Sequence, residues 1–234
     1  EGSYLVDIMN EVGYDVIVPG NHEFDYGMDR FLELAEMQDT DYICCNFIDL
    51  TTGEPVFDSY EMISYGDVDV AYIGIDTPET FSKSTPAYFQ DDEGNYIYGF
   101  CEGNDGQDLY DAVQAAIDDA VAAGADYVVA CGHLGTDEQS APWRSTDVIA
   151  NVTGLDAFID GHSHSTIAEE DVLDKDGNTV VLTSSGTKLA AIGKLVIGAD
   201  GTVSSSLVTD YTEKDATVAA FVDSILAENE ELLQ

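Results

Sequence analysis

Residues 15–22 read Asp-Val-Ile-Val-Pro-Gly-Asn-His, a short apolar run that stops at a glycine and two polar side chains. The pattern recurs at 125–133 (Ala-Asp-Tyr-Val-Val-Ala-Cys-Gly-His) and at 155–162 (Leu-Asp-Ala-Phe-Ile-Asp-Gly-His). Short apolar runs between helical patterns are typical of buried strands in an α/β sheet. Ligands bind such sheets outside the carboxyl ends of the strands, where glycine lets the backbone approach closely. We therefore expect these three strand ends to bring their polar side chains to one edge of the sheet.

All the histidines of the 234-residue chain lie in these three motifs: His22, His133, His162 and His164. Neutral imidazole is the commonest protein ligand for metals such as zinc. A single histidine at a strand end is more often a structural group, and Asn21 alone could be a turn residue. Four histidines grouped with glycine at three strand ends favour a metal and phosphate site over that interpretation.

Three strings carry a family resemblance: Gly-Asn-His-Glu-Phe-Asp-Tyr-Gly at 20–27, Gly-His-Leu-Gly at 132–135 and Asp-Gly-His-Ser-His at 160–164. Together they closely resemble the calcineurin-like metallophosphoesterases, and within them the 5'-nucleotidase and 2',3'-cyclic-nucleotide phosphodiesterase family. The resemblance continues through 76–80, 83–86 and the glycine-bearing segment 186–195. It implies an α/β fold, the metallophosphoesterase four-layer sandwich, in which two mixed sheets pack together and are flanked by helices.

The resemblance also implies a set of metal ligands. In that family two metal ions lie side by side and share a bridging hydroxide, which attacks phosphorus in line with the leaving oxygen. By motif position, Asn21, His133 and His162 would bind the second metal, and His164 would bind the first. The cofactors would be two divalent cations, and zinc, manganese, iron and cobalt suit these ligands about equally.

Two further residues of the first string are implied to act without binding metal. His22 would stabilise the phosphoryl oxygens and assist the leaving group, because an imidazolium places charge where it develops in the transition state. Asp25 would hold His22 in its productive tautomer. Asp25 can also serve as the N-cap of the helix that follows, and the two roles are compatible.

The start of the chain departs from the family pattern. Family members begin with an Asp-x-His motif and then a Gly-Asp motif whose aspartate bridges both metals, and neither precedes residue 20 here. We therefore expect a metallophosphoesterase domain over 1–212 that lacks its N-terminal strands, followed by a linker helix over 213–234. A catalytic metal needs about three protein ligands, so we expect a partial or empty metal site and weak hydrolysis by this chain alone. The C-terminal domain that stacks the nucleobase in two-domain members is also expected to be missing.

The composition limits the partners. Forty-seven acidic and seven basic residues give a net charge of −40, which repels nucleic acids and anionic membrane surfaces. No apolar stretch approaches the roughly 18 residues of a membrane-spanning helix. The expected partner is a small-molecule nucleotide, whose phosphate the metals would have to attract. An acidic, solvated surface and the family resemblance together favour an extracellular, cell-surface or periplasmic location.

The four cysteines and two acidic turns have ordinary structural explanations. Adjacent Cys44 and Cys45 lie in an apolar run, where side chains alternate between opposite faces. We expect the cysteines to be small buried apolar residues, with a disulfide at Cys101 left open. Segments 91–95 and 174–178 are expected to be hairpin turns, because neither has a complete calcium-loop pattern.

Apolar periodicity predicts alternating helices and strands. Helices are expected at 3–12, 28–37, 107–123, 145–152 and 215–233, and strands at 15–19, 41–48, 60–65, 69–76, 125–131, 155–159, 179–184, 190–197 and 202–210. The region 80–105 is expected to be irregular, with strand-like sequence from 166 onward. Loss of the first strands of the fold would leave an unpaired edge in the middle of a sheet, so we expect dimerisation or strand exchange there.

Three functions remain open from the sequence. The first is a dinuclear metal hydrolase of nucleotide phosphoesters, as a 5'-nucleotidase, a 2',3'-cyclic phosphodiesterase or a nucleotide-sugar hydrolase. The second is a relative that has lost catalysis and binds a ligand or partner at the cell surface. The third is an extracellular structural module that takes up cations on its acidic surface. Intact His22 and Asp25 favour the first, because a retired site has little reason to keep a pair that does not bind metal.

Overall fold

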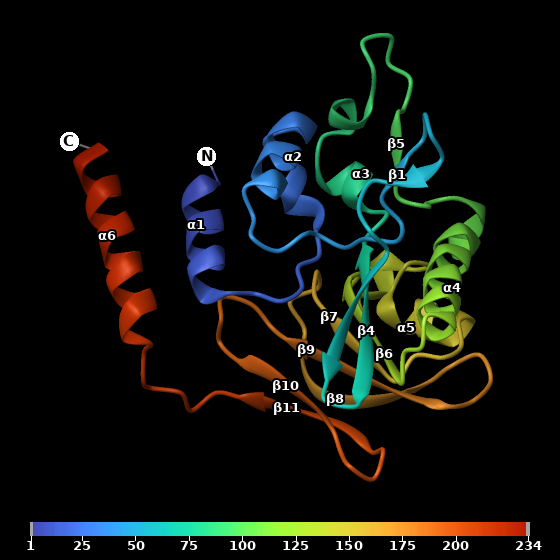
Figure 1. Ribbon diagram of the computed structural model, residues 1–234. Helices are drawn as coiled ribbons and strands as arrows, with labels where there is room; N and C mark the ends of the chain where they lie inside the picture. Colours follow the sequence, from blue (N-terminus) through green and yellow to red (C-terminus); the bar gives the residue numbers. More distant parts are fainter. Residues whose placement is uncertain (1, 233–234) are drawn as a thin grey trace.

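The computed structural model describes residues 2–232 (Figure 1). Its α-helices are α1 (Ser3–Val12), α2 (Met28–Glu36), α3 (Thr80–Lys83), α4 (Gln107–Ala122), α5 (Ser145–Asn151) and α6 (Ala216–Leu232). Single 3-10 turns are η1 (Asn21–Phe24), η2 (Pro86–Phe89), η3 (Asn104–Gly106) and η4 (Glu138–Ser140). The five predicted helices are therefore present, each within about two residues of its expected ends.

The strands form three sheets. They are β1 (Ile48–Asp49), β2 (Glu54–Pro55), β3 (Tyr60–Tyr65), β4 (Val68–Asp76), β5 (Tyr98–Gly99), β6 (Tyr127–His133), β7 (Ala157–Asp160), β8 (Thr166–Leu173), β9 (Thr179–Ser185), β10 (Ile192–Ile197) and β11 (Val203–Val208). The main sheet has six strands in the order β3-β4-β6-β7-β9-β8. Its four central strands are parallel, and β3 and β8 are antiparallel edge strands. The smaller sheets are β2-β1-β5 and the antiparallel pair β10-β11.

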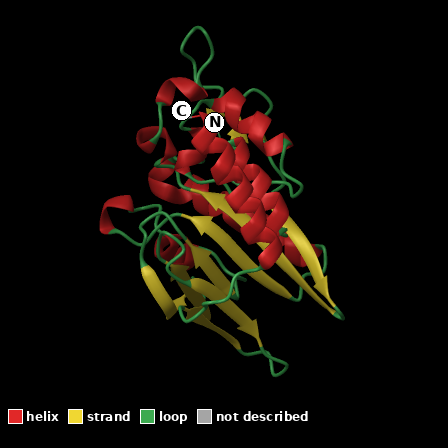
Figure 2. Cartoon of the chain, turned by 90° about the vertical axis from the view of Figure 1, so that its left-hand side faces the viewer, coloured by secondary structure: helices red, strands yellow, loops and turns green. Residues whose placement is uncertain are grey.

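Helices α4 and α5 cover one face of the main sheet (Figures 1 and 2). Their apolar sides meet inward-facing residues of β4, β6, β7 and β9 in the largest core, where each fully buried large side chain contributes about 1.5–3 kcal/mol. The members of this core that are wholly buried include Ile73, Ile75, Leu109, Val113, Ala130, Leu134, Val148, Ile149, Phe158 and Leu182. The predicted α/β class and layered arrangement are confirmed.

The opposite face of the main sheet is covered only in part. Leu195, Ile197 and Val203 of the β10-β11 pair pack on Val70 and Val181 of the main sheet. Beside them a groove of about 620 Å³ is lined by apolar and tyrosine side chains of β3, β4, β6, β7 and β10. β10 pairs with β11 along one edge, and no described strand pairs with its other edge. The expectation that strands are missing from a sheet stays a prediction, and the groove and the edge of β10 are where an additional strand could pair.

Two predicted strands are wrong. Segment 15–19 makes one parallel bridge, between Ile17 and Tyr42, instead of a ladder. Segment 41–48 changes partner at each residue: the N–H groups of Ile43, Cys44 and Cys45 donate to carbonyls of residues 17, 58 and 74. Its strand β1 begins only at residue 48. The apolar composition of both segments indicated burial. Neither segment forms a strand, because it crosses between neighbours and does not run alongside one of them for several residues.

The region 80–105, expected to be irregular, closes a second core made of aromatic rings. Phe24 lies edge-on to Phe31, Phe47, Phe89 and Phe100, with ring centroids 4.8, 5.4, 5.3 and 5.5 Å away. All five rings are essentially without solvent exposure. Edge-to-face pairs of this kind add about 0.5–1.5 kcal/mol each beyond area burial. Phe24 is the last residue of η1, so this core fixes the turn that begins with Asn21 and His22.

The turn predictions are confirmed, and the expected burial of the cysteines holds for Cys44 and Cys45, whereas Cys101 and Cys131 are only partly buried. Cys44 belongs to the aromatic core and Cys45 to the main core, on opposite sides of their segment. All four cysteines are free, and burial raises the pKa of the Cys44, Cys101 and Cys131 thiols to about 12. Segments 91–95 and 174–178 close as turns, in which Asp91 and Asp174 accept backbone N–H bonds from two residues and four residues ahead.

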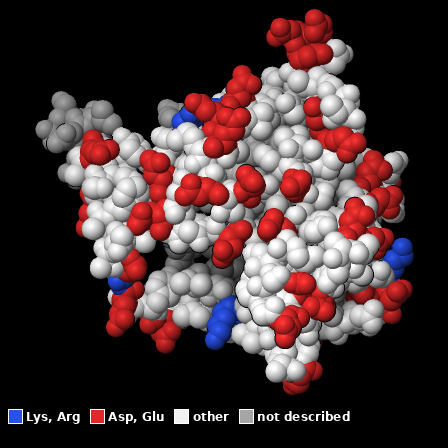
Figure 3. Space-filling view, viewed as in Figure 1, with Lys and Arg blue, Asp and Glu red and all other residues white. Residues whose placement is uncertain are grey.

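The two ends of the described chain lie near one another, because α6 runs beside α1 (Figure 1). Acidic side chains are scattered over the visible face, with few basic ones between them (Figure 3). Among residues 2–232, no helix has the length and apolar character that crossing a membrane requires.

Candidate active site

The predicted site residues meet in one pocket of about 340 Å³. Its lining comprises Asn21, His22, Lys83, His133, Asp137, Gln139, Ser140, His162, Ser163 and His164. All four histidines and Asn21 are therefore brought together from three distant parts of the chain. Asp25 does not line the pocket, but it contacts His22 from behind.

Two of the lining histidines face the side-chain oxygen of Asn21. His133 Nε2 and His162 Nδ1 each lie 3.1 Å from Asn21 Oδ1. The two rings are edge to face, with centroids 5.0 Å apart. The three side chains expected to share one metal thus converge on one point, whereas His164 lines the pocket without a hydrogen bond to them.

The sheet explains this convergence. β4, β6 and β7 are parallel neighbours, and the register places Asp76 opposite His133 at the carboxyl ends of β4 and β6. His133 is the last residue of β6, so the strand runs two residues further than predicted and the histidine is not in the following loop. His162 and His164 follow β7 directly, and the main chain at both has positive φ, 69° and 55°. Non-glycine residues adopt this conformation at a cost of order 1–3 kcal/mol, mostly where function or packing requires it.

Asp160 joins the two histidine loops. Its Oδ1 accepts the N–H groups of Leu134, Gly135 and Gly161 at 3.0, 3.1 and 2.9 Å. Burial raises the pKa of the Asp160 carboxyl, and these hydrogen bonds act in the opposite direction. One carboxylate therefore sets the spacing between the loop after His133 and the loop that carries His162.

Glycine is needed where the backbone meets the His133 ring. A Cβ at Gly20 would come within 2.9 Å of that ring, and a Cβ at Gly161 would lie 3.1 Å from its Nδ1. Neither glycine has a positive φ, so the requirement is space and not backbone conformation. The first motif is further fixed by the N–H of Gly20, which donates to Glu23 Oε2 at 2.5 Å.

Protonation favours His133 as a ligand. Burial, followed by the neighbouring histidines, lowers the pKa of its imidazole to about 4. The ring is thus neutral near pH 7 and has a lone pair to offer on one nitrogen. Among residues 2–232, no group of three His, Cys, Asp or Glu side chains is arranged to hold a metal ion. The converging set consists of two histidines and the amide of Asn21.

His22 and Asp25 form a separate pair. His22 Nδ1 lies 2.8 Å from Asp25 Oδ2, with side chains 76% and 41% exposed. A carboxylate can only accept here, so His22 carries a proton on Nδ1 and turns Nε2 away from Asp25. The pair stands at the solvent side of the pocket.

Sequence reasoning missed several residues of the site, among them Glu79, Lys83 and Ser140. Glu79 Oε2 lies 3.0 Å from His162 Nε2 and accepts from the Ser140 hydroxyl at 2.6 Å. Glu79 and Lys83 lie within strings that carried the family resemblance, which was the available signal. Ser140 had none, because η4 comes near Glu79 only through the fold.

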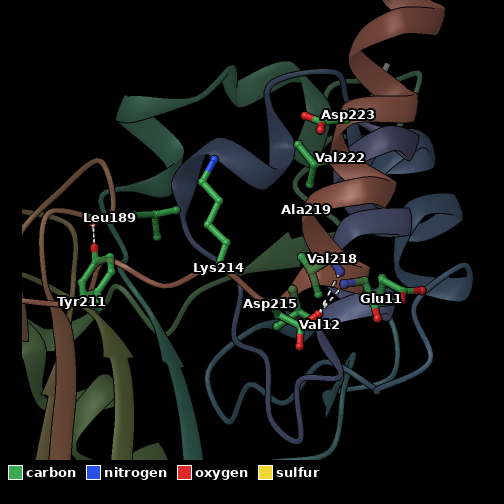
Figure 4. Close-up of a pocket in the computed structure, with 11 residues that line it drawn as sticks. Glu11, Val12, Leu189, Tyr211, Lys214, Asp215, Val218, Ala219, Val222 and Asp223 are labelled. Carbon is green, nitrogen blue, oxygen red and sulfur yellow. Dashed lines mark hydrogen bonds between the residues drawn. The ribbon is translucent and has the colours of Figure 1, made fainter.

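A larger pocket, of about 840 Å³, lies elsewhere, between α1, α6 and the segments around Leu189 and Tyr211 (Figure 4). There the Tyr211 hydroxyl donates to the Leu189 carbonyl, and Asp215 accepts from the start of α6. None of the histidines lines this pocket. The larger of the two pockets is therefore not the one that holds the predicted site residues.

His133 and His162 lie at the carboxyl ends of parallel strands, where ligands of α/β sheets bind, and imidazole is a common ligand of zinc in catalytic sites. Residues 3–166 match the family model of the calcineurin-like phosphoesterases. The chain therefore belongs to the calcineurin-like phosphoesterase family, which is a family of hydrolases.

Curated relatives carry nucleotidase names. The chain is 29% identical over 171 residues to the 2',3'-cyclic-nucleotide 2'-phosphodiesterase/3'-nucleotidase of Haemophilus influenzae, covering 68% of this chain and 24% of that protein. It is 34% identical over 80 residues to the 5'-nucleotidase of Vibrio vulnificus, covering 34% of this chain and 14% of that one. The chain thus spans a quarter or less of the length of these relatives.

Solved structures share the fold. The 5'-nucleotidase precursor of Thermus thermophilus superposes with a TM-score of 0.76 at 20% identity, covering 100% of this chain and 46% of that one. The calcineurin-like phosphoesterase YfkN of Bacillus subtilis gives 0.76 at 22% identity, covering 98% and 74%.

Proposed function

We propose that this chain carries most of the catalytic site of a metal-dependent phosphoester hydrolase that acts on nucleotides, as a 5'-nucleotidase or a 2',3'-cyclic-nucleotide phosphodiesterase. The main support is the convergence of His133 Nε2 and His162 Nδ1 on Asn21 Oδ1, each at 3.1 Å. The nucleotidase names of the curated relatives support the substrate class.

The donor set fits a divalent cation. Asn21, His133 and His162 offer one oxygen and two imidazole nitrogens, a mixture that zinc, manganese, iron or cobalt accepts. His164 is the donor proposed for a second ion. When bound, such cations polarise the phosphoryl group and supply a nucleophile at neutral pH.

His22 acts on the substrate and not on the metal in this proposal. Asp25 Oδ2 accepts the Nδ1 proton of His22, with 2.8 Å between the two heavy atoms, and Nε2 of this lining residue has no protein partner among the hydrogen bonds of residues 2–232. Protonated at Nε2, the ring donates to a phosphoryl oxygen or to the leaving oxygen, where negative charge grows in the transition state. Asp25 stabilises the resulting imidazolium.

A second candidate is a metallophosphoesterase-like binding domain without catalysis. One observation favours it: among residues 2–232, no group of three His, Cys, Asp or Glu side chains is arranged to hold a metal ion. The proposal therefore includes weak metal binding and weak hydrolysis by this chain alone. The hydrogen-bonded pair of His22 and Asp25 favours the catalytic candidate.

The remaining features of the proposal concern the whole protein. They are a metallophosphoesterase domain over 1–212, a linker helix over 213–234, a further nucleotide-binding domain, an extracellular or periplasmic location, and association through the free edge of β10. The scattered acidic surface is compatible with a small nucleotide partner and unsuited to nucleic acid.

The test compares two forms of the protein: the 234-residue chain and a form extended upstream by its natural sequence. Each is assayed with AMP and with a 2',3'-cyclic nucleotide, in the presence of manganese, cobalt or zinc. We expect rapid metal-dependent phosphate release from the extended form and little from the 234-residue chain. Metal binding without turnover in the extended form would support the binding domain, and equal turnover by both forms would refute the proposed weakness of the chain.

A further inference from the structure

Glu79 contacts three side chains that line the pocket, those of His162, Ser140 and Lys83. Its Oε2 meets His162 Nε2 at 3.0 Å and the Ser140 hydroxyl at 2.6 Å. Its Oε1 faces the Lys83 ammonium at 3.9 Å. The Glu79 and His162 side chains are each only 12% exposed. A carboxylate so enclosed is stable only if its oxygens are hydrogen-bonded, and here donors face both of them.

The contact fixes the proton on the His162 ring. An ionised carboxylate can only accept a hydrogen bond, so the proton between His162 and Glu79 belongs to Nε2. In the neutral ring, Nδ1 then has a lone pair and no hydrogen. That lone pair faces Asn21 Oδ1 at 3.1 Å, and the amide oxygen is itself an acceptor. Two acceptors at this distance repel one another unless a positive charge lies between or beside them.

Glu79 is held in place by the end of β4. The buried Asp76 accepts the N–H of Thr77 at 2.8 Å and the hydroxyl of Thr80 at 3.0 Å, so it closes the turn that carries Glu79. The carbonyl of Glu79 accepts the N–H groups of Ser82 and Lys83, each at 2.8 Å. The carboxylate therefore stands on a hydrogen-bonded turn at the carboxyl end of β4, beside that of β6.

We infer that Glu79 is a positioning residue that selects the tautomer of His162, so that the ring presents Nδ1 to a cation held with Asn21. This rests on the proposed function, because it takes the convergence on Asn21 for a cation site. Without Glu79 the ring would gain more by placing its proton on Nδ1 and donating to Asn21 Oδ1. That hydrogen bond would occupy the two atoms that the cation needs. Carboxylates that orient a metal-binding histidine in this way contribute about 10- to 100-fold to metal affinity.

The tautomer is measurable without any metal. In the full chain labelled with ¹⁵N in its histidine rings, at about pH 8 where an ordinary imidazole is neutral, two-bond ¹H–¹⁵N correlations report which nitrogen carries the proton. We expect His162 to show the Nε2–H pattern in the wild-type protein. In Glu79→Ala we expect the proton to move wholly or partly to Nδ1. In Glu79→Gln the amide oxygen can still accept from Nε2, so the wild-type pattern should be largely retained.

Two controls separate a tautomer effect from a general loss of charge or packing. Glu138→Gln removes a carboxylate from the exposed side of η4, and it should leave the His162 pattern unchanged. Ser140→Ala removes the other donor to Glu79 Oε2 and should also preserve it. A proton on Nδ1 in the wild-type protein would overturn the inference without any variant, which matters if Glu79→Ala fails to fold. An unchanged Nε2–H pattern in folded Glu79→Ala would overturn it too.

Zn²⁺ titration by calorimetry on the same proteins completes the test. We expect the Zn²⁺ affinity of Glu79→Ala to fall about 10- to 100-fold below wild type, with a smaller fall for Glu79→Gln. Unchanged affinity in Glu79→Ala despite a shifted proton would overturn the link between the tautomer and the cation. Absence of Zn²⁺ binding to the wild-type protein and to its upstream-extended form would overturn the proposed cation site itself, and the tautomer measurement would still report on Glu79 independently.

Discussion

Single carboxylates orient the polar groups of this site one by one. Asp25 holds His22, Asp160 joins the loops of His133 and His162, and Glu79 holds the far side of the His162 ring. Because each carboxylate acts on a different group, replacing each residue should change a different measurable property. Removing an orienting group should change protonation or geometry, whereas removing His22 should change turnover.

His22→Ala is the direct test of catalysis. In the form extended upstream by its natural sequence, we expect this change to lower the rate of phosphate release by about 10²–10⁴-fold, the usual contribution of a positioned acid or base. The metal content, measured by atomic emission on the purified protein, should not change, because His22 is hydrogen-bonded to Asp25 and is not one of the donors that converge on Asn21 Oδ1. Asp25→Asn should reduce the rate less, since the ring remains. Loss of metal from His22→Ala would mean that His22 is a ligand.

Asp76→Asn should change how stability depends on pH. Asp76 is fully buried, and burial raises the pKa of its carboxyl well above 3.8 in spite of the bonds from Thr80 and Thr77. The folded state therefore binds this proton more tightly than the unfolded state. The stabilisation is complete below the unfolded pKa and is lost as the pH rises through the folded pKa. Asparagine mimics the protonated form and does not titrate. As the pH rises from about 5 to 8, the free energy of unfolding of wild type should therefore fall relative to that of the variant.

Urea unfolding at a series of pH values measures this difference. Asp92→Asn, at an exposed position of a turn, is the matched control and should follow wild type at every pH. An Asp76→Asn difference that stays constant or shrinks with rising pH would show that the buried carboxyl is not more easily protonated in the folded state.

At the scale of the elements, the position of η1 depends on the packing of the Phe24 ring. Phe24 ends this turn and contacts four aromatic rings at centroid distances of 4.8–5.5 Å. Phe24→Ala should cost about 3–5 kcal/mol of stability, as deletions of buried phenylalanines do. Tyr26→Ala, two residues later and 61% exposed, should stay within about 0.5 kcal/mol of wild type. Equal losses in the two variants, measured by urea unfolding, would show that the aromatic core does not hold η1.

The elements also show what sequence could and could not predict. Strands β4, β6 and β9 and helix α4 followed from apolar period alone, because each packs on one large core. Segments 15–19 and 41–48 have the same apolar composition but cross between partners, and their pairing is decided by distant residues such as Asp58 and Gly74. The histidines were found because metal-type side chains at strand ends are rare. Ser140 was missed because a serine has no distinctive pattern until the fold brings it near His162. Glu79 lies in a string of the family resemblance, but only the fold shows that it contacts His162.

At the scale of the whole molecule, net charge and apolar surface oppose one another. Each chain carries −40, so two copies repel at low ionic strength. The groove beside β10 nevertheless exposes apolar surface next to a strand edge that no described strand pairs, and such edges recruit further strands. Raising the salt from about 0.1 to 1 M shortens the screening length from about 10 to 3 Å. We therefore expect a monomer in low salt and a concentration-dependent dimer in high salt.

Light scattering on two matched variants locates the contact. Tyr65, which is 55% exposed, lines the groove, and Leu173 on β8 is 59% exposed outside it. Lysine at either position makes the same change in net charge, so repulsion between copies is reduced equally. Only Tyr65→Lys places an ammonium group in the groove, where a docked strand would have to desolvate it. We expect Tyr65→Lys to remain monomeric in high salt while Leu173→Lys dimerises like wild type. A wild-type protein that stays monomeric at every salt concentration would show that the apolar surface of the groove is too small to overcome the repulsion between the charged chains. If the two variants behave alike, the dimer contact does not lie in the groove beside β10.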